Sequence, residues 1–398
     1  MGSTPTTFSK SFLQPEPLPE AAVEAAVRSM RSGRLHRYDA AADDPGETAM
    51  LELEFARYQG SRYCLACASG GYALHIALLS AGVARGDTVL VNGFTLAPVP
   101  GAIHNAGART VLVEINDNLT IDLEDLAAKA EAHAARYLLL SHMRGHMANM
   151  DHVMAICERH GLTLIEDCAH TLGALWDGKR SGSFGAASCF STQTYKHLNS
   201  GEGGLLVTDR DDIIARAILH SGSYMLFDSH LARPPADSFD AVKLDTPNYS
   251  GRMDNLRAAT LRPQLELLDQ NCRRWNERYD TLANGLASIT GIHLPARPAR
   301  ETYVGSSIQF SLPGLSTENV ERFVENCASR GVQLKWFGAD LPHGFTSRFD
   351  SWRYLEDIPQ LPHTRGVLEK LVDMRIPLTF DLDDCRLIVE IIADVLAT

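Results

Sequence analysis

Short apolar runs alternate with amphipathic stretches along the first half of the chain, from about residue 63 to residue 208. Each run has the length and the polar flanks of a β-strand, and the stretches between the first five have helical spacing. Near-continuous apolar strands that alternate with helices are typical of a mostly parallel sheet covered by helices on both faces. The seven predicted strands are Tyr63–Ala66, Thr88–Val91, Thr110–Val113, Tyr137–Ser141, Thr163–Glu166, Ala187–Phe190 and Gly204–Val207. The helical stretches between them are Tyr72–Ser80, Pro98–Ala106, Leu123–Ala134 and Asp151–His160.

The pattern differs on both sides of this region. The first residues are rich in proline and predict an extended arm, followed by helices at Glu20–Ser32, ended by Gly33, and at Ala49–Tyr58. After about Asp254, mixed helical and strand patterns predict a smaller α+β domain. Its predicted elements are the helices Leu256–Asn284, Thr317–Arg330 and Asp383–Leu396 and the strands Ser307–Ser311 and Val332–Trp336. The expected units are an arm (1–20), a large domain (21–255) and a small domain (256–398).

The composition limits the class of protein and its partners but does not indicate a reaction. Of the 398 residues, 45% are hydrophobic and 22% are charged, as in ordinary soluble proteins. The formal net charge is −12 and no basic tract occurs, so nucleic acids and anionic membranes are not expected partners. No apolar run approaches the length of a membrane span, and a loose myristoylation pattern at Gly2 is the one feature that suggests an anchor.

The eight cysteines are scattered, which predicts reduced thiols in a cytoplasmic protein rather than a disulfide framework. Cys64 and Cys67 form one CxxC inside an apolar run. We interpret them as core residues, the alternative being a redox or metal pair.

The strongest chemical signal lies between residues 163 and 208. The apolar strand TLIED ends in Asp167, and His170 follows three residues later; the strand ASCFS ends in Ser191, and Lys196 and a GEGG turn follow. Singly, these features are typical of a helix cap, a solvated lysine and an ordinary turn. Together they could bracket one aromatic phosphate cofactor. The carboxylate would face a pyridine nitrogen, the hydroxyl would bind phosphate, and the amine would form a Schiff base.

A second signal is the turn Ser69-Gly70-Gly71, which joins a strand to a helix. Backbone N–H groups at a helix start suit a phosphate, although the segment taken alone is better explained as a tight strand-to-helix turn. Neither a GxGxxG fingerprint after the first strand nor a Walker A loop is present.

These segments resemble the DegT/DnrJ/StrS family of aminotransferases. The matching motifs, in order, are SMRSGRLHRY, LELEFARYQGS, ASGGYALHIAL, HGLTLIEDCAHTLGA, GSFGAASCFS, YKHLNSGEGGLLVT and GRMDNLRAA. The resemblance runs from about residue 14 to the C-terminal helix and is looser after Arg257. It implies a fold-type-I pyridoxal 5′-phosphate (PLP) enzyme, a homodimer whose active sites are each completed by the partner chain.

The resemblance also implies residue roles. Lys196 would hold PLP as a Schiff base and move protons, Asp167 would pair with the pyridine nitrogen, and His170 would lie beside the ring hydroxyl. Ser191 and the turn Gly70-Gly71-Tyr72 would bind the phosphate.

The chain departs from the family pattern at three cofactor positions. Gly71 replaces a threonine, so a hydroxyl contact to phosphate is missing. Leu96 stands where an aromatic residue commonly covers the ring and could cover it by dispersion. Ser250-Gly251-Arg252 replaces Asn-Tyr-Arg, which in the family reaches the partner's phosphate, and Ser250 could replace the amide.

The candidate substrate residues are Tyr38, His142 and Arg144. Arg144 is a candidate for binding a substrate carboxylate, the alternative being a surface cation. His142 and His146 are four residues apart, but on a strand and loop they need not share a face, so no metal site is expected.

The late segment KWFGADLPHGFTSRFDSWRY is rich in aromatic residues and predicts either a substrate lid or packing between the domains. The segment holds Trp336, Phe337, Phe345, Phe349 and Trp352, with Arg348 and Arg353.

We therefore expect a PLP-dependent aminotransferase. The donor would resemble glutamate or glutamine. The acceptor would be a keto-sugar, a cyclitol ketone or a related small ketone or aldehyde in secondary-metabolite or cell-surface biosynthesis. One alternative keeps the cofactor and catalyses elimination, dehydration or β/γ-replacement on an amino-acid-like substrate. The other is a non-catalytic ligand-binding regulator, which the presence of Lys196 disfavours.

Overall fold

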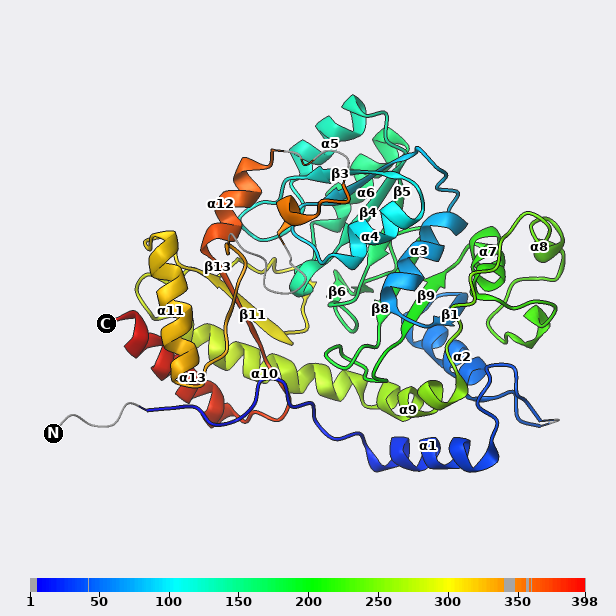
Figure 1. The fold of residues 1–398 in the computed structure, drawn as a ribbon, viewed down its shortest axis with the longest axis horizontal. Helices are drawn as coiled ribbons and strands as arrows, with labels where there is room; N and C mark the ends of the chain where they lie inside the picture. Colours follow the sequence, from blue (N-terminus) through cyan, green and yellow to red (C-terminus); the bar gives the residue numbers. More distant parts are fainter. Residues whose placement is uncertain (1–5, 42, 340–347, 356–357, 359, 398) are drawn as a thin grey trace.

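The structure is a computed structural model that describes residues 6–41, 43–339, 348–355, 358 and 360–397. Its centre is a seven-stranded sheet in the order β1-β9-β8-β5-β4-β2-β3 (Figure 1). The strands from β8 to β3 run parallel, whereas β9 is antiparallel to both of its neighbours. The mostly parallel sheet is thus confirmed, and all seven predicted strands are present. They are β1 Tyr63–Cys67, β2 Thr88–Asn92, β3 Arg109–Val113, β4 Tyr137–Ser141, β5 Thr163–Asp167, β8 Ala187–Ser191 and β9 Gly204–Thr208.

Alternate strand residues face two different apolar cores. In β1, Leu65 and Cys67 belong to one core, and Cys64 and Ala66 belong to the other. The two cysteines of the CxxC therefore lie on opposite faces of the strand, as buried core residues. The first core is covered by α3 Gly70–Ser80, α4 Pro98–Asn105 and α7 Asp211–Ser221. The second is covered by α2 Glu47–Gln59, α5 Leu123–Ala132, α6 Met150–His160 and α9 Asn255–Glu266.

A three-stranded sheet in the order β11-β13-β12 carries a third core (Figure 1). Phe8 and Phe12 of the arm belong to this core, where their ring centroids lie 5.0 and 4.9 Å from that of Phe380. The arm is therefore anchored on the C-terminal part of the chain, and the division into three units remains a prediction. The elements are β11 Ser307–Ser311, β12 Lys335–Trp336, β13 Leu371–Arg375, α10 Leu268–Ala287, α11 Thr317–Ser329 and α13 Leu382–Leu396.

Helix ends follow the sequence signals closely, with one exception. α1 (Glu20–Ser32) has its predicted bounds because Gly33, with φ +72°, ends it in the left-handed conformation. The helix predicted over 256–284 is instead two helices, α9 and α10, separated at Leu267. Pro263 lies inside α9, where it cannot donate a helical hydrogen bond. No helix in the described part of the chain is long and apolar enough to cross a membrane.

Candidate active site

The carboxyl ends of the parallel strands bring the predicted site residues to one edge of the large sheet. Asp167 ends β5 and Ser191 ends β8, and these strands are neighbours. The loop after β8 carries Lys196, whose Nζ lies 2.6 Å from Nε2 of His170. Ligands of open α/β sheets bind beyond this edge, so the four residues stand where a ligand would lie.

Burial sets the protonation of the Lys196–His170 pair. Burial, with the charges of Lys196 and Arg144, holds the pKa of His170 well below its usual value. The Nδ1 atom of this neutral ring accepts the backbone N–H of Arg144 at 3.3 Å, so Nε2 carries the proton and faces Lys196. Burial also lowers the pKa of Lys196 to about 7, with Asp167 opposing the shift and Arg144 and Arg375 adding to it. A large share of the Lys196 amine is therefore neutral near pH 7, which a nucleophilic amine requires.

Acetylation of the cofactor-free protein should therefore follow an unusual titration at Lys196. We expect the rate of modification by acetic anhydride, measured by peptide mass spectrometry, to reach half its plateau near pH 7. An unstructured lysine peptide in the same tube should titrate near its ordinary pKa of about 10.4. A Lys196 midpoint at the peptide's value would contradict the low pKa.

A relay of hydroxyl groups fixes Asp167. Thr95 donates to Ser141 Oγ at 2.8 Å, and Ser141 donates to Asp167 Oδ2 at 2.9 Å. The backbone N–H of Ala169 donates to Oδ1 at 3.1 Å. Thr95 and Ser141 are both buried and both lie at or just beyond a strand end, but they were not predicted as site residues. Their role is to position the carboxylate.

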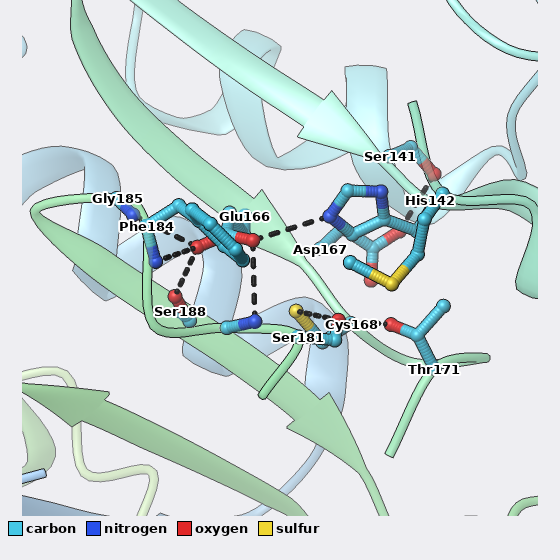
Figure 2. Close-up of polar contacts among 12 residues, drawn as sticks. Ser141, His142, Glu166, Asp167, Cys168, Thr171, Ser181, Phe184, Gly185 and Ser188 are labelled. Carbon is cyan, nitrogen blue, oxygen red and sulfur yellow. Dashed lines mark hydrogen bonds and ion pairs between the residues drawn. The ribbon is translucent and has the colours of Figure 1, made fainter. Parts of the chain in front are cut away.

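Glu166, the neighbour of Asp167, belongs to a separate buried cluster (Figure 2). Figure 2 shows its carboxylate between His142, whose Nε2 lies 3.2 Å away, and the loop of Phe184 and Gly185, whose N–H groups donate at 2.8 Å. Burial alone would raise the pKa of Glu166, but His142 and these amides lower it below its usual value. The His142 side chain is 0% exposed and faces Glu166, and its predicted substrate contact stays a prediction. Its position after β4 turns the ring inward.

The same cluster contains three residues of the kinds that bind metal ions, but their contacts do not favour a metal site. Ligand atoms of His142, Glu166 and Cys168 lie within 4.8 Å of one another. Both Glu166 oxygens already accept hydrogen bonds, and burial raises the pKa of the Cys168 thiol well above its usual value. His146 bonds Gln309 through Nε2 at 2.7 Å instead of facing His142. We interpret these residues as structural.

The start of α3 and Ser191 form one cradle. Ser69 caps the helix by accepting the N–H of Tyr72 at 3.1 Å. A Cβ added to Gly70 would lie 2.9 Å from Cβ and 3.3 Å from Oγ of Ser191, so this glycine lets the helix start touch the serine. A Cβ on Gly204 would meet the Ser69 carbonyl oxygen at 2.3 Å, so the GEGG turn also packs directly against the helix start. Helix-start amides beside a hydroxyl fit a phosphate group.

A family model described as the DegT/DnrJ/EryC1/StrS aminotransferase family matches residues 22–392. The chain belongs to this family. It is 38% identical over 244 residues to L-glutamine:scyllo-inosose aminotransferase of Streptomyces griseus, covering 59% of this chain and 55% of that protein. It is 30% identical over 314 residues to 3-amino-5-hydroxybenzoate synthase of Amycolatopsis mediterranei (strain S699), covering 77% and 76%. A crystal structure of 3-amino-5-hydroxybenzoic acid synthase superposes with a TM-score of 0.83 at 26% identity, covering 97% of this chain and 99% of that one.

The chain spans little more than half the length of several curated relatives that it matches. Three of the curated relatives, the S. griseus aminotransferase among them, are matched over 55–57% of their own length.

Three of the predicted cofactor-binding residues, Tyr72, Leu96 and Ser250, have defined surroundings. Tyr72 donates its hydroxyl to the His220 carbonyl at 3.0 Å, and its ring covers Gly251, so its side chain is occupied in packing. Leu96 is half-buried against the first core. Ser250 is exposed, with φ +53°, and its Oγ accepts from Arg252 at 3.0 Å. The cofactor contacts of all three stay predictions.

The other two predicted substrate residues are tied to different groups. Tyr38 lies 3.0 Å from Nε2 of His230, in a buried network with Arg37 and Glu52. Arg144 is 14% exposed and pairs with Asp373 at 2.7 Å, which excludes the surface-cation alternative.

Three of the described aromatic residues of the segment 335–354 pack into the first core. Phe337 lies edge-on to Phe94 at 5.0 Å, and Phe349 and Trp352 are buried in the same core. Phe345 lies outside the described residues. The lid remains a prediction.

Proposed function

We propose that this chain is a PLP-dependent aminotransferase that moves an amino group from a donor like glutamate or glutamine to a small ketone or aldehyde. The observation that carries the proposal is the partly neutral amine of Lys196, 2.6 Å from His170 and beside Asp167 at the sheet edge. The relatives' names support a keto-sugar or cyclitol acceptor, because one names L-glutamine and scyllo-inosose. The setting would be secondary-metabolite or cell-surface biosynthesis, and the buried free cysteines favour the cytoplasm.

The residues divide the chemical work. When bound, PLP would accept the electron pair left when a proton leaves the substrate carbon. Asp167, fixed by Ser141, would keep the pyridine nitrogen protonated. Ser191 and the α3 amides would hold the phosphate, and Lys196 would take up and return the proton, oriented by His170.

We also propose a homodimer with shared active sites. Tyr224, Met225 and Leu244 are 64%, 87% and 90% exposed, which is unusual for large apolar side chains unless a partner covers them. Ser250, which is exposed, follows the last of them closely in the chain and would reach the partner's cofactor.

Gly70→Ala should weaken cofactor binding, since the new methyl group would force Ser191 away from the helix start. We expect the dissociation constant for PLP, measured by equilibrium dialysis, to rise about tenfold or more, the loss of one charge-assisted hydrogen bond. Gly101→Ala is the matched control, because nothing lies within 4 Å of a Cβ there. Equal affinities in the two variants would contradict the cradle.

The donor half-reaction tests the proposed function. The PLP-loaded protein is mixed with L-glutamate or L-glutamine without acceptor, and absorbance follows conversion of the cofactor to its amine form. Conversion with release of the matching keto acid supports transamination. Ammonia and a keto acid from an amino-acid substrate, without the amine form, would favour the elimination alternative. An absorbance spectrum unaffected by Lys196→Ala would favour a non-catalytic regulator.

A further inference from the structure

Charged residues on one face of the small sheet are turned toward Lys196. Asp373 of β13 is in register with Gln309 of β11 and with Lys335 of β12, and Arg375 follows two residues later on the same face. The alternate residues of β13, Val372 and Met374, face the third core. The charged face therefore points away from that core.

The Lys196 loop and the turn after β4 close this face from the other side. The guanidinium of Arg375 lies 3.7 Å from the ring centroid of Tyr195, the residue before Lys196. Arg144, in the 3₁₀ turn η1 (Met143–Gly145), reaches Asp373 at 2.7 Å and gives its backbone N–H to His170. Arg375 and Lys196 also line one pocket with the arm residues 12–19.

Among the residues that the structure describes, one carboxylate is in contact with these cations, that of Asp373. Asp373 faces the cluster, but one of its oxygens bonds Arg144 and the other accepts from Gln309 at 2.7 Å. The guanidinium of Arg375 packs against Tyr195. Its Nη1, like Nε of Arg144, is enclosed and donates no hydrogen bond to any residue that the structure describes. A buried N–H group without an acceptor costs free energy, so a ligand that accepts a hydrogen bond from it would bind favourably.

The pKa values of these cations are lowered by burial and by one another, which favours the binding of an anion beside them. Burial lowers the pKa of Arg375, and Arg144 adds to the effect. Burial lowers the pKa of Lys335 to about 8, with Arg144 contributing. The same two arginines help to lower the pKa of Lys196.

We propose that Arg375, with Arg144 and Lys335, binds a carboxylate group of the substrate beside Lys196. The inference rests on the proposed aminotransferase function and names a chemical group that its substrate carries. A planar carboxylate matches the fork of a guanidinium and would accept from Nη1 of Arg375, which donates to no residue that the structure describes. Phe337, with Lys335 at 4.9 Å and Arg144 at 6.0 Å from its ring, forms a wall of the site.

Binding of an unreactive probe tests the site. The PLP-loaded protein is titrated by calorimetry with glutarate, a dicarboxylate without an amino group, and with its neutral analogue glutaramide. We expect glutarate to bind at least tenfold more tightly than glutaramide. Arg375→Met should weaken glutarate binding about tenfold or more and leave glutaramide unchanged.

Two further variants complete the test. Arg322→Met, on the exposed face of α11, should bind glutarate like the unaltered protein. Arg375→Lys keeps the positive charge but removes the two-pronged guanidinium, so glutarate should bind several-fold more weakly. This variant replaces Arg375→Met in the test if Arg375→Met does not fold. Equal glutarate affinity in the Arg375 and Arg322 variants overturns the proposal.

The donor half-reaction then shows which substrate carries the carboxylate. If the donor carries it, Arg375→Met raises the half-saturating concentration of L-glutamate. If the acceptor carries it, that concentration is unchanged and the acceptor's KM rises instead. Should no donor alter the cofactor spectrum while glutarate still requires Arg375, the aminotransferase proposal fails and the anion site stands.

Discussion

Replacing Lys196 with alanine is expected to lower the turnover number by at least about 10³-fold, in the upper part of the range for losing a general acid–base catalyst. The reason is the position and pKa of the amine. It lies 2.6 Å from a neutral His170, and its pKa of about 7 lets it take up and release a proton near neutral pH. The measurement is the single-turnover rate of the donor half-reaction, followed by cofactor absorbance.

The control for this experiment is Lys179→Ala, which removes an exposed lysine from β7 (Lys179–Arg180). That variant should keep its full rate. Borohydride reduction followed by denaturation should leave PLP attached to the unaltered chain and to the control, but not to the Lys196 variant. A Lys196 variant that keeps both the rate and the attachment would require another amine to act.

The sequence predicted the large sheet well because each strand is a near-continuous apolar run between polar residues. It also located Asp167, Ser191 and Lys196, since residues at the carboxyl ends of parallel strands meet at one edge. The Thr95–Ser141 relay was missed. That contact depends on β4 lying between β5 and β2, and the strand order is set by tertiary packing.

The central strand of the small sheet was missed for a different reason. β13 has the sequence LVDMR, in which Asp373 and Arg375 interrupt the apolar run. These are the residues that face Lys196 and Arg144 in the folded protein. Sequence patterns are expected to predict secondary structure poorly where residues are selected for a functional site. The contact of His142 with Glu166 was not predicted, because a position after a strand does not tell which way its side chain turns.

Glu166→Gln is expected to destabilise the protein by about 1–3 kcal/mol, the usual cost of leaving a buried hydrogen-bond donor without its acceptor. The carboxylate is 0% exposed and accepts hydrogen bonds from two backbone amides at 2.8 Å while facing His142. An amide side chain would turn its own N–H₂ toward one of these donors. Urea unfolding with saturating cofactor measures the loss, and Glu131→Gln on the exposed side of α5 should change stability by less than about 0.5 kcal/mol.

The pH dependence separates the charge of Glu166 from its shape. The folded-state pKa of Glu166 lies below the ordinary value of 4.5, so its stabilisation is complete above pH 4.5 and is lost as pH falls through the folded-state pKa. Glutamine does not titrate, so the stability gap between the two proteins should narrow as pH falls below 4.5. A double-mutant cycle with His142→Ala should yield a coupling energy of about 0.5–3 kcal/mol. If the difference in stability between the two proteins is constant with pH and shows no coupling to His142, Glu166 acts by its shape alone. Its charge would then contribute nothing to the stability of the protein.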